Sequence, residues 1–274
     1  MLIETLSTFP HMYDSVMGES MMKRAQEKGI LEFRAHDLRD WTHDRHRTTD
    51  DDPYGGGAGL VMKCDPIFEA VEAILGKEFV EAKLAAAPPQ GESQQRSSAA
   101  PQIVFLAPQG RPFDDAYADK LAAADHLLFI CGHYEGIDER VYALADHVIS
   151  LGDYVLTSGE LASMVVIDAA VRKLPGVLGA AEGPVDESFT SGLLEYPQYT
   201  RPADFRGMRV PEVLTSGNHA AIARWRREQS LARTAAARPD LIAAAEAAGR
   251  LTPADQKFLK LLGPAPTGAA EGVS

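Results

Sequence analysis

Three apolar runs in the middle of the chain each end in a loop that contains glycine. Residues 103–106 (IVFL) lead into APQG, residues 126–131 (HLLFIC) lead into GHYEG, and residues 147–150 (HVIS) lead into LGDYVLTSGE. Continuous apolar strands that alternate with helical segments favour a mostly parallel sheet with both faces covered. Ligands bind outside the carboxyl ends of the strands in such sheets, so we expect the three loops to meet in one crevice.

Helical segments are predicted around these runs. Residues 11–28 have a helical composition and lie between apolar runs at 3–6 and 30–35, which indicates an opening β-α-β unit. A helix is expected from about residue 66 to residue 84, and another over 160–173. Thr157 and Glu160 match a T-x-x-E capping box at the start of the latter.

Composition divides the chain into segments. Residues 1–177 form the predicted α/β domain, in which 85–102 is a Pro-, Ser- and Gln-rich insertion expected to be flexible. Small, polar and acidic residues over 178–192 predict an interdomain linker. Residues 193–262 are rich in alanine and have the pattern of helices, and this change in composition indicates a second domain. Residues 263–274 are expected to be a disordered tail.

Whole-chain properties exclude several classes of protein. The two cysteines are far apart, so no disulfide framework is indicated and a reducing cytoplasm fits best. No run is long and apolar enough for a membrane helix, and the start lacks the pattern of a signal peptide. A net charge of −12 argues against a generic nucleic-acid binder. Two arginine-bearing patches, at 44–47 and 224–238, fit phosphate contacts or ordinary surface ion pairs equally well.

Familiar catalytic signatures are missing from the sequence. There is no P-loop, no G-x-G-x-x-G after the first strand, no G-x-S-x-G elbow and no H-E-x-x-H. The histidines of 43–46 favour a hydrated polar loop over a metal site, and no metal ligand set is predicted. Glycines at strand ends let the backbone approach a flat ligand, and main-chain groups read adenine without charged side chains. The three loops together therefore favour a cofactor crevice.

Several longer runs resemble, in order, the bacterial tRNA (guanine-N1)-methyltransferases, and the resemblance extends to about residue 262. The matching runs are THDRHRT (42–48), DPYGGGAG (52–59), APQG (107–110), CGHYEGIDERV (131–141), LGDYVLTSGEL (151–161), LPGVLG (174–179), YTRP (199–202), PEVLTSGNH (211–219) and RWRREQSL (224–231).

This resemblance implies an α/β fold of the SPOUT type, with a mostly parallel sheet and a deep trefoil knot, followed by a small all-helical domain that binds tRNA. It also implies a cytoplasmic homodimer whose active sites lie at the subunit interface. The implied reaction is transfer of a methyl group from S-adenosylmethionine to N1 of guanosine 37 in tRNAs with a preceding guanosine, and Mg²⁺ is a possible requirement for activity.

Site residues follow from matching positions. The resemblance implies that the cofactor pocket is built from the three loops, namely Leu106, Pro108, Gly132, Tyr134, Glu135, Gly136, Leu151, Gly152, Asp153, Tyr154, Val155, Leu156 and Gly159. It implies a carboxylate base at Glu187 or the adjacent Asp186, and Arg172 as the cation that assists at guanine O6. The residues expected to contact tRNA are Arg45, Arg47, Arg224, Arg226 and Arg227.

The sequence departs from the family pattern at a few positions. Glu187 stands where the family has its catalytic aspartate, and His133 stands where an arginine is usual. Ser158 and Ala162 replace a glycine and a proline, so the third loop must tolerate a Cβ at residue 158. Two alternatives stay open on these grounds: a SPOUT enzyme that methylates another RNA position, and an RNA-binding homologue with impaired catalysis.

Overall fold

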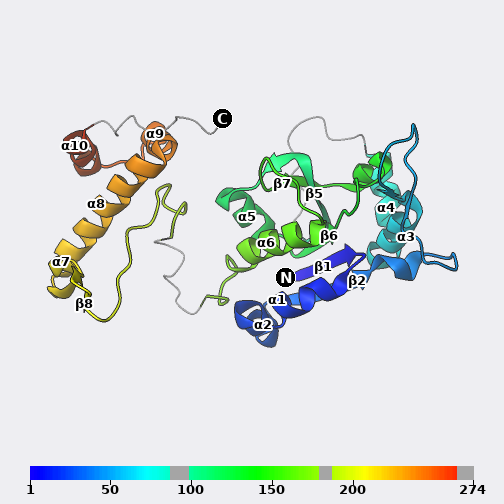
Figure 1. The fold of residues 1–274 in the computed structure, drawn as a ribbon, viewed down its shortest axis with the longest axis horizontal. Helices are drawn as coiled ribbons and strands as arrows, with labels where there is room; N and C mark the ends of the chain where they lie inside the picture. The colour runs from blue at the N-terminus through cyan, green and yellow to red at the C-terminus, as the bar shows by residue number, and fades with distance from the viewer. Residues whose placement is uncertain (87–98, 179–186, 264–274) are drawn as a thin grey trace. The chain divides into compact units, whose positions relative to one another are not determined.

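The computed structural model describes residues 1–86, 99–178 and 187–263, and the chain divides into two compact units, Met1–Ala181 and Glu182–Ser274 (Figure 1). Most of the predicted insertion, much of the predicted linker and nearly all of the predicted tail lie outside these described residues. The two units are therefore considered one at a time.

A five-stranded sheet forms the centre of the first unit. Its strands are β1 (Leu2–Ser7), β2 (Glu32–Asp37), β5 (Gln102–Pro112), β6 (His126–Ile130) and β7 (His147–Ser150), in the order β2-β1-β6-β5-β7. All four neighbouring pairs run parallel. The expectation of a mostly parallel sheet is thus confirmed, and it places the carboxyl ends of β6, β5 and β7 side by side.

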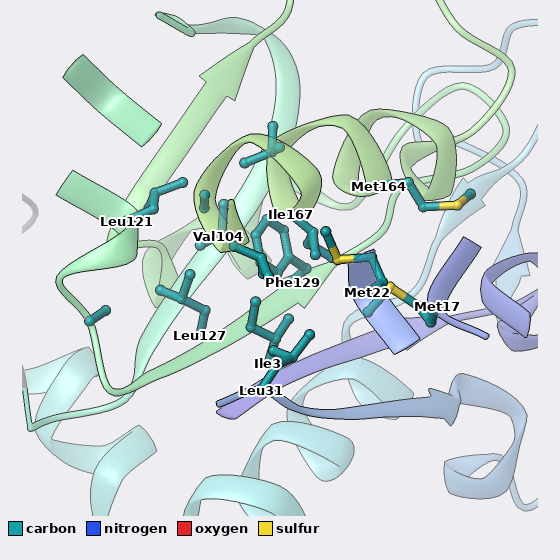
Figure 2. Close-up of a cluster of buried hydrophobic side chains, with 14 of the residues drawn as sticks. Ile3, Met17, Met22, Leu31, Val104, Leu121, Leu127, Phe129, Met164 and Ile167 are labelled. Atoms are coloured by element: carbon teal, nitrogen blue, oxygen red, sulfur yellow. The ribbon is translucent and has the colours of Figure 1, made fainter. Parts of the chain in front are cut away.

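Helices cover both faces of this sheet. Leu127 and Phe129 of β6 point into one core with Leu121 and Ile167, whereas Leu128 and Ile130 of the same strand belong to a second core with residues of α3. Figure 2 shows the first core, where β1, β5 and β6 meet the helical side chains. Alternate residues of one strand are buried on opposite faces, which explains the uninterrupted apolar runs.

The remaining elements of the first unit are mostly short helices. They are η1 (Pro10–Tyr13), α1 (Asp14–Met17), α2 (Ser20–Glu27), η2 (Leu38–Trp41), the strand pair β3 (Asp50–Asp51) and β4 (Val61–Met62), α3 (Cys64–Leu75), α4 (Lys77–Ala85), α5 (Asp115–Ala122), η3 (Glu139–Leu144) and α6 (Gly159–Val171). Helices α2, α5 and α6 contribute to one core, and α3, α4 and η3 contribute to the other.

Two predicted helices are each broken in the structure. The segment expected from 66 to 84 is two helices, α3 and α4, because Gly76 between them adopts a φ of +95° that a continuous helix does not allow. The segment 11–28 likewise forms η1, α1 and α2 in succession.

The predicted capping box at the start of α6 is wrong. The N-cap of this helix is Ser158, which makes no side-chain capping hydrogen bond. The side chain of Glu160 is fully buried and accepts a hydrogen bond from Ser7 Oγ instead of turning back to the helix start. A contact with a distant strand has therefore replaced the local one that the spacing indicated.

The segment 107–110, expected as a loop after a strand, lies within β5. Leu106 and Arg111 both pair with Ile149 of β7, so the four residues between them form an irregularity in the ladder. A Cβ at Gly110 would lie 2.5 Å from the Ile149 nitrogen. Only glycine fits this close approach of two backbones.

The second unit consists of a hairpin and helices. Its elements are β8 (Asp204–Phe205), β9 (Met208–Arg209), α7 (Glu212–Thr215), α8 (His219–Ala237), α9 (Pro239–Ala247) and α10 (Pro253–Leu262). Leu193, Leu231, Ala245 and Leu251 form its small core. Within the described parts of the chain, no helix has the length and apolar character that a membrane span needs.

Candidate active site

A cavity of about 340 Å³ lies at the carboxyl ends of β5, β6 and β7. It is lined by residues of all three glycine-bearing segments. The predicted cofactor residues that line it are Leu106, Pro108, Gly132, Tyr134, Glu135, Gly136, Leu151, Gly152, Tyr154, Val155, Leu156 and Gly159. Of the predicted set only Asp153 is not among the lining residues.

The third glycine-bearing segment, residues 151–159, closes the cavity where it crosses the end of β5. Strand β7 is separated from β6 by β5, yet the Gly159 N–H donates to the Gly132 carbonyl at 2.7 Å. His133 and Ser158 form an antiparallel bridge beside this bond. A Cβ at Gly159 would lie 2.7 Å from the Gly132 nitrogen, so the close contact depends on glycine at this position.

The second glycine-bearing segment, residues 132–136, is hydrogen-bonded to the strand pair of residues 50–62. The Glu135 N–H donates to the Leu60 carbonyl at 3.1 Å, and the Met62 N–H donates to the Gly136 carbonyl at 2.9 Å. Tyr134 adopts a left-handed φ of 58°, and its side chain stays 44% exposed. These bonds fix the backbone of 133–136 while leaving its side chains at the cavity.

The lining charge of the cavity is acidic. Among the described residues that line it there is no Lys or Arg, whereas Glu135 and Glu139 both contribute. Burial, followed by the nearby Asp50 carboxylate, raises the pKa of Tyr134, so its phenol stays neutral. The cavity therefore suits a flat ligand with positive charge better than a phosphate.

The sequence reasoning missed several lining residues. Gln109, Ile137, Glu139, Tyr142 and Ile149 also face the cavity. Glu139 and Tyr142 lie in η3, which closely follows the second glycine-bearing segment, residues 132–136. Their closeness to that segment in the sequence was the only indication that they could reach the cavity. Ile149 is a fully buried strand residue, and its place at the cavity, beside the irregularity in β5, had no sequence signal.

Three of the four positions that depart from the family pattern lie together, and the fourth, Glu187, is in the second unit. His133, Ser158 and Ala162 all line the cavity. Ser158 has a φ of −158°, which is extended backbone that any residue adopts, so its Cβ causes no strain. The His133 ring packs between Phe9 and Tyr134, at centroid distances of 4.9 and 4.8 Å. Its Nδ1 and the Ser158 Oγ are buried and have no hydrogen-bond partner among the described residues.

A buried polar cluster includes Cys131 and Ser163, the sequence neighbours of the lining residues Gly132 and Ala162. The Tyr13 hydroxyl contacts Ser163 Oγ at 2.6 Å and Cys131 Sγ at 3.0 Å. Burial, followed by the charge of Glu160, raises the pKa of the Cys131 thiol to about 12. Cys131 is therefore a protonated structural thiol and has no nucleophilic role.

The candidate catalytic residues lie in different units. Arg172 is the C-cap of α6 in the first unit and is half-buried. Glu187 is half-buried in the second unit, where the adjacent Ser188 hydroxyl accepts a hydrogen bond from the Glu195 N–H. Asp186 lies outside the described residues. Arg172 and Glu187 are therefore each described within their own unit.

The two predicted tRNA arginines of the first unit lie in the polar loop before β3. Arg45 is exposed, and Arg47 donates to the Arg39 carbonyl at 3.2 Å and pairs with Asp40. His43 of the same loop bonds the Glu69 carboxylate at 2.8 Å. Among the described residues no three His, Cys, Asp or Glu side chains gather in a way that could hold a metal.

The three arginines predicted on α8 have different surroundings. Arg224 is exposed, and the Arg226 guanidinium lies over the Tyr196 ring at 4.8 Å. Arg227 makes two hydrogen bonds to the buried Asp255, at 3.1 and 2.9 Å, and so joins α8 to α10. Burial opposes ionisation of Asp255, but the bonds from Arg227 and Thr252 outweigh it and lower the pKa of this carboxyl.

Comparisons with known proteins agree on one family along most of the chain. A family model described as tRNA (Guanine-1)-methyltransferase TrmD matches residues 1–244. The tRNA (guanine-N(1)-)-methyltransferase of Symbiobacterium thermophilum is 52% identical over 260 residues, which covers 95% of this chain and 97% of the relative. That of Limosilactobacillus reuteri is 51% identical over 246 residues, covering 90% and 91%. The chain therefore belongs to the tRNA (guanine-1)-methyltransferase family.

Proposed function

We propose that this protein transfers a methyl group from S-adenosylmethionine to N1 of guanosine 37 in tRNAs that carry a guanosine before it. The observation that carries the proposal is the cavity formed by three segments at the carboxyl ends of β5, β6 and β7, with acidic groups and no Lys or Arg among its described lining residues. Family membership supports the same reaction class.

The lining residues fit S-adenosylmethionine. Residues 106–109, 132–136, 151–152 and 154–156 line the cavity, so their backbone groups outside the hydrogen bonds described above can meet an adenosine, and Gly159 permits the close approach that shapes the cavity. The Glu135 and Glu139 carboxylates favour a ligand with net positive charge. When bound, the cofactor supplies a methyl group that is electrophilic because its sulfur is a sulfonium.

The protein's own groups are then needed to orient and deprotonate guanine. N1 of guanine carries a proton at neutral pH, and we propose that the Glu187 carboxylate accepts it, with Asp186 as the alternative base. Negative charge then grows on O6, where the permanent cation of Arg172 would lower the barrier. Holding both groups against the base contributes further to the rate.

A homodimer is proposed from the exposed side chains beside the cavity. Val155 is 87% exposed, Val165 54% and Leu161 44%, and all three lie on the third segment or on α6. Such apolar exposure is typical of a surface that another subunit covers. An active site at this interface would bring a second subunit to the cavity. The crossing of residues 151–158 over the end of β5 supports the trefoil knot that the SPOUT resemblance implies.

The second unit is proposed to bind tRNA through Arg224 and Arg226, and the loop at Arg45 and Arg47 is proposed to add contacts from the first unit. Arg227 is held by Asp255, so its proposed share is smaller. Among the described residues no cluster of side chains could bind Mg²⁺, so no step of the proposed reaction is assigned to this ion. A tRNA-modifying activity is consistent with a cytoplasmic location.

Methyl transfer under single-turnover conditions tests the proposal. Wild-type protein should methylate a tRNA transcript with guanosine 37 and leave a transcript with adenosine 37 unmodified. Glu187→Gln should slow the reaction by roughly two to four orders of magnitude, the usual loss for a general base. Near-normal transfer by Glu187→Gln together with loss in Asp186→Asn would move the base to Asp186.

The two alternatives give other results in the same assay. A SPOUT enzyme of different specificity would place the methyl group on another nucleoside. An impaired homologue would bind S-adenosylmethionine and show no turnover on the guanosine 37 transcript.

A further inference from the structure

The second unit contains a cavity of its own, of about 400 Å³, and among its lining residues only Arg226 has a role in the proposed function. The segment 196–203 forms one wall, and α8, with residues at the end of α7, forms the other. This volume lies in the range of sites that bind small ligands. The cavity is built entirely from described residues of one unit.

Three aromatic rings line this cavity. Tyr199 and Trp225 lie with ring centroids 6.3 Å apart at an interplanar angle of 54°, and Tyr199 is 49% exposed. Tyr196 forms the third ring and lies beneath the Arg226 guanidinium. Exposed rings beside a cavity are platforms on which nucleobases stack, because every base has a π-face.

The charge of the lining selects an anion. Arg201 and Arg226 both line the cavity, and no Asp or Glu does so among the described residues, although the chain as a whole has a net charge of −12. The Arg226 Nε is buried and has no hydrogen-bond partner in the described structure. A buried donor without an acceptor costs free energy, so a bound acceptor at this position would recover it.

We propose that this cavity binds one unpaired nucleotide of RNA, whose base stacks on Tyr199 and Trp225 and whose phosphate pairs with Arg201 and Arg226. A base inside a helix has both faces covered by its neighbours, so the occupant must be unstacked. The proposal rests on the proposed function only in taking the RNA to be the tRNA substrate.

Binding of a short unstructured RNA oligomer and of a blunt RNA duplex of the same length tests the proposal without any methyl transfer. Tyr199→Leu should weaken binding of the unstructured RNA by roughly tenfold, the effect of losing one stacking ring, and should leave duplex binding unchanged. Tyr199→Phe keeps the ring and should bind as the wild type does. Phe205→Leu is the matched control, because Phe205 is a similarly exposed ring with an arginine over it, in the same unit and outside the cavity.

Tryptophan fluorescence gives a second readout that a merely structural role would not move. The chain has two tryptophans. Quenching of tryptophan fluorescence by the unstructured RNA should disappear in Trp225→Phe, and a separate thermal unfolding measurement checks that this variant is folded. The proposal is overturned if wild-type protein binds duplex and unstructured RNA alike, if Phe205→Leu loses as much affinity as Tyr199→Leu, or if no quenching occurs. Loss of methyl transfer with intact Tyr199-dependent binding would instead overturn the proposed function alone.

Discussion

Replacing Gly159 with alanine should deform the cavity at the point where its third segment meets the second. The new Cβ would lie 2.7 Å from the Gly132 nitrogen and 3.0 Å from the Cys131 Cα, which are backbone atoms that cannot rotate away. Ordinary contact begins at 3.4 Å, so the two segments must separate by about 0.7 Å. The 2.7 Å hydrogen bond from the Gly159 N–H to the Gly132 carbonyl then lengthens beyond useful range.

The cost combines overpacking, about 1–3 kcal/mol, with loss of a hydrogen bond worth about 1 kcal/mol. A domain of this size loses about 2–4 °C of Tm per kcal/mol, so differential scanning calorimetry should show a fall of roughly 4–16 °C. Calorimetric titration should show binding of S-adenosylmethionine weakened by about tenfold or more, because a displacement of this size disrupts positioned contacts.

Gly132→Ala is the matched control for the loss of stability, since its Cβ would meet only the Ile137 side chain, at 3.4 Å. Its Tm should stay within about 2 °C of the wild-type value. The reasoning is refuted if Gly159→Ala melts with the wild type and binds the cofactor normally, or if the two glycine variants lose equal stability.

Three further predictions concern titration, the helical unit and assembly. Burial, followed by the charge of Lys120, lowers the pKa of His147 from 6.5 to about 4, so the unfolded chain binds this proton first as the pH falls. Urea unfolding should therefore show stability lost between pH 7 and pH 4, by about 3 kcal/mol from this group, and His147→Gln should reduce that slope. Arg227→Gln leaves the buried Asp255 carboxylate without two hydrogen bonds from a cation and should destabilise the protein by about 1–3 kcal/mol in urea unfolding. An unchanged midpoint would show that the pair contributes nothing. Val165→Asp puts a charge on the exposed apolar face of α6, so light scattering should give the proposed dimer for the wild type and folded monomers for the variant. A variant that still forms dimers would place the interface elsewhere.

The sheet and the meeting of the three loops could be predicted because each depends on a pattern within one segment. The side chains on both faces of β6 are apolar, so both faces of the sheet must be covered, whichever segments of the chain cover them. The ends of parallel strands at one edge then bring Gly132 and Leu151 to the same cavity.

The details that failed depend on contacts between distant segments. Thr157 and Glu160 have the spacing of a capping box, but Ser7 on β1 bonds the Glu160 carboxylate and the Gly159 N–H is taken by Gly132. Nothing near residue 160 in the sequence indicates either partner. The break at Gly76 is similar, because a glycine within a helical pattern is compatible with a continuous helix, and only the φ of +95° in the structure reveals the break.

The central claim is most directly tested by mass spectrometry of tRNA that has been incubated with the wild-type protein and S-adenosylmethionine and then digested to nucleosides and to oligonucleotides. We expect one methyl group per tRNA, on N1 of the guanosine at position 37, and only in tRNAs with a guanosine before it. A methyl group on another atom or at another position, or no incorporation by protein that binds the cofactor, would contradict it.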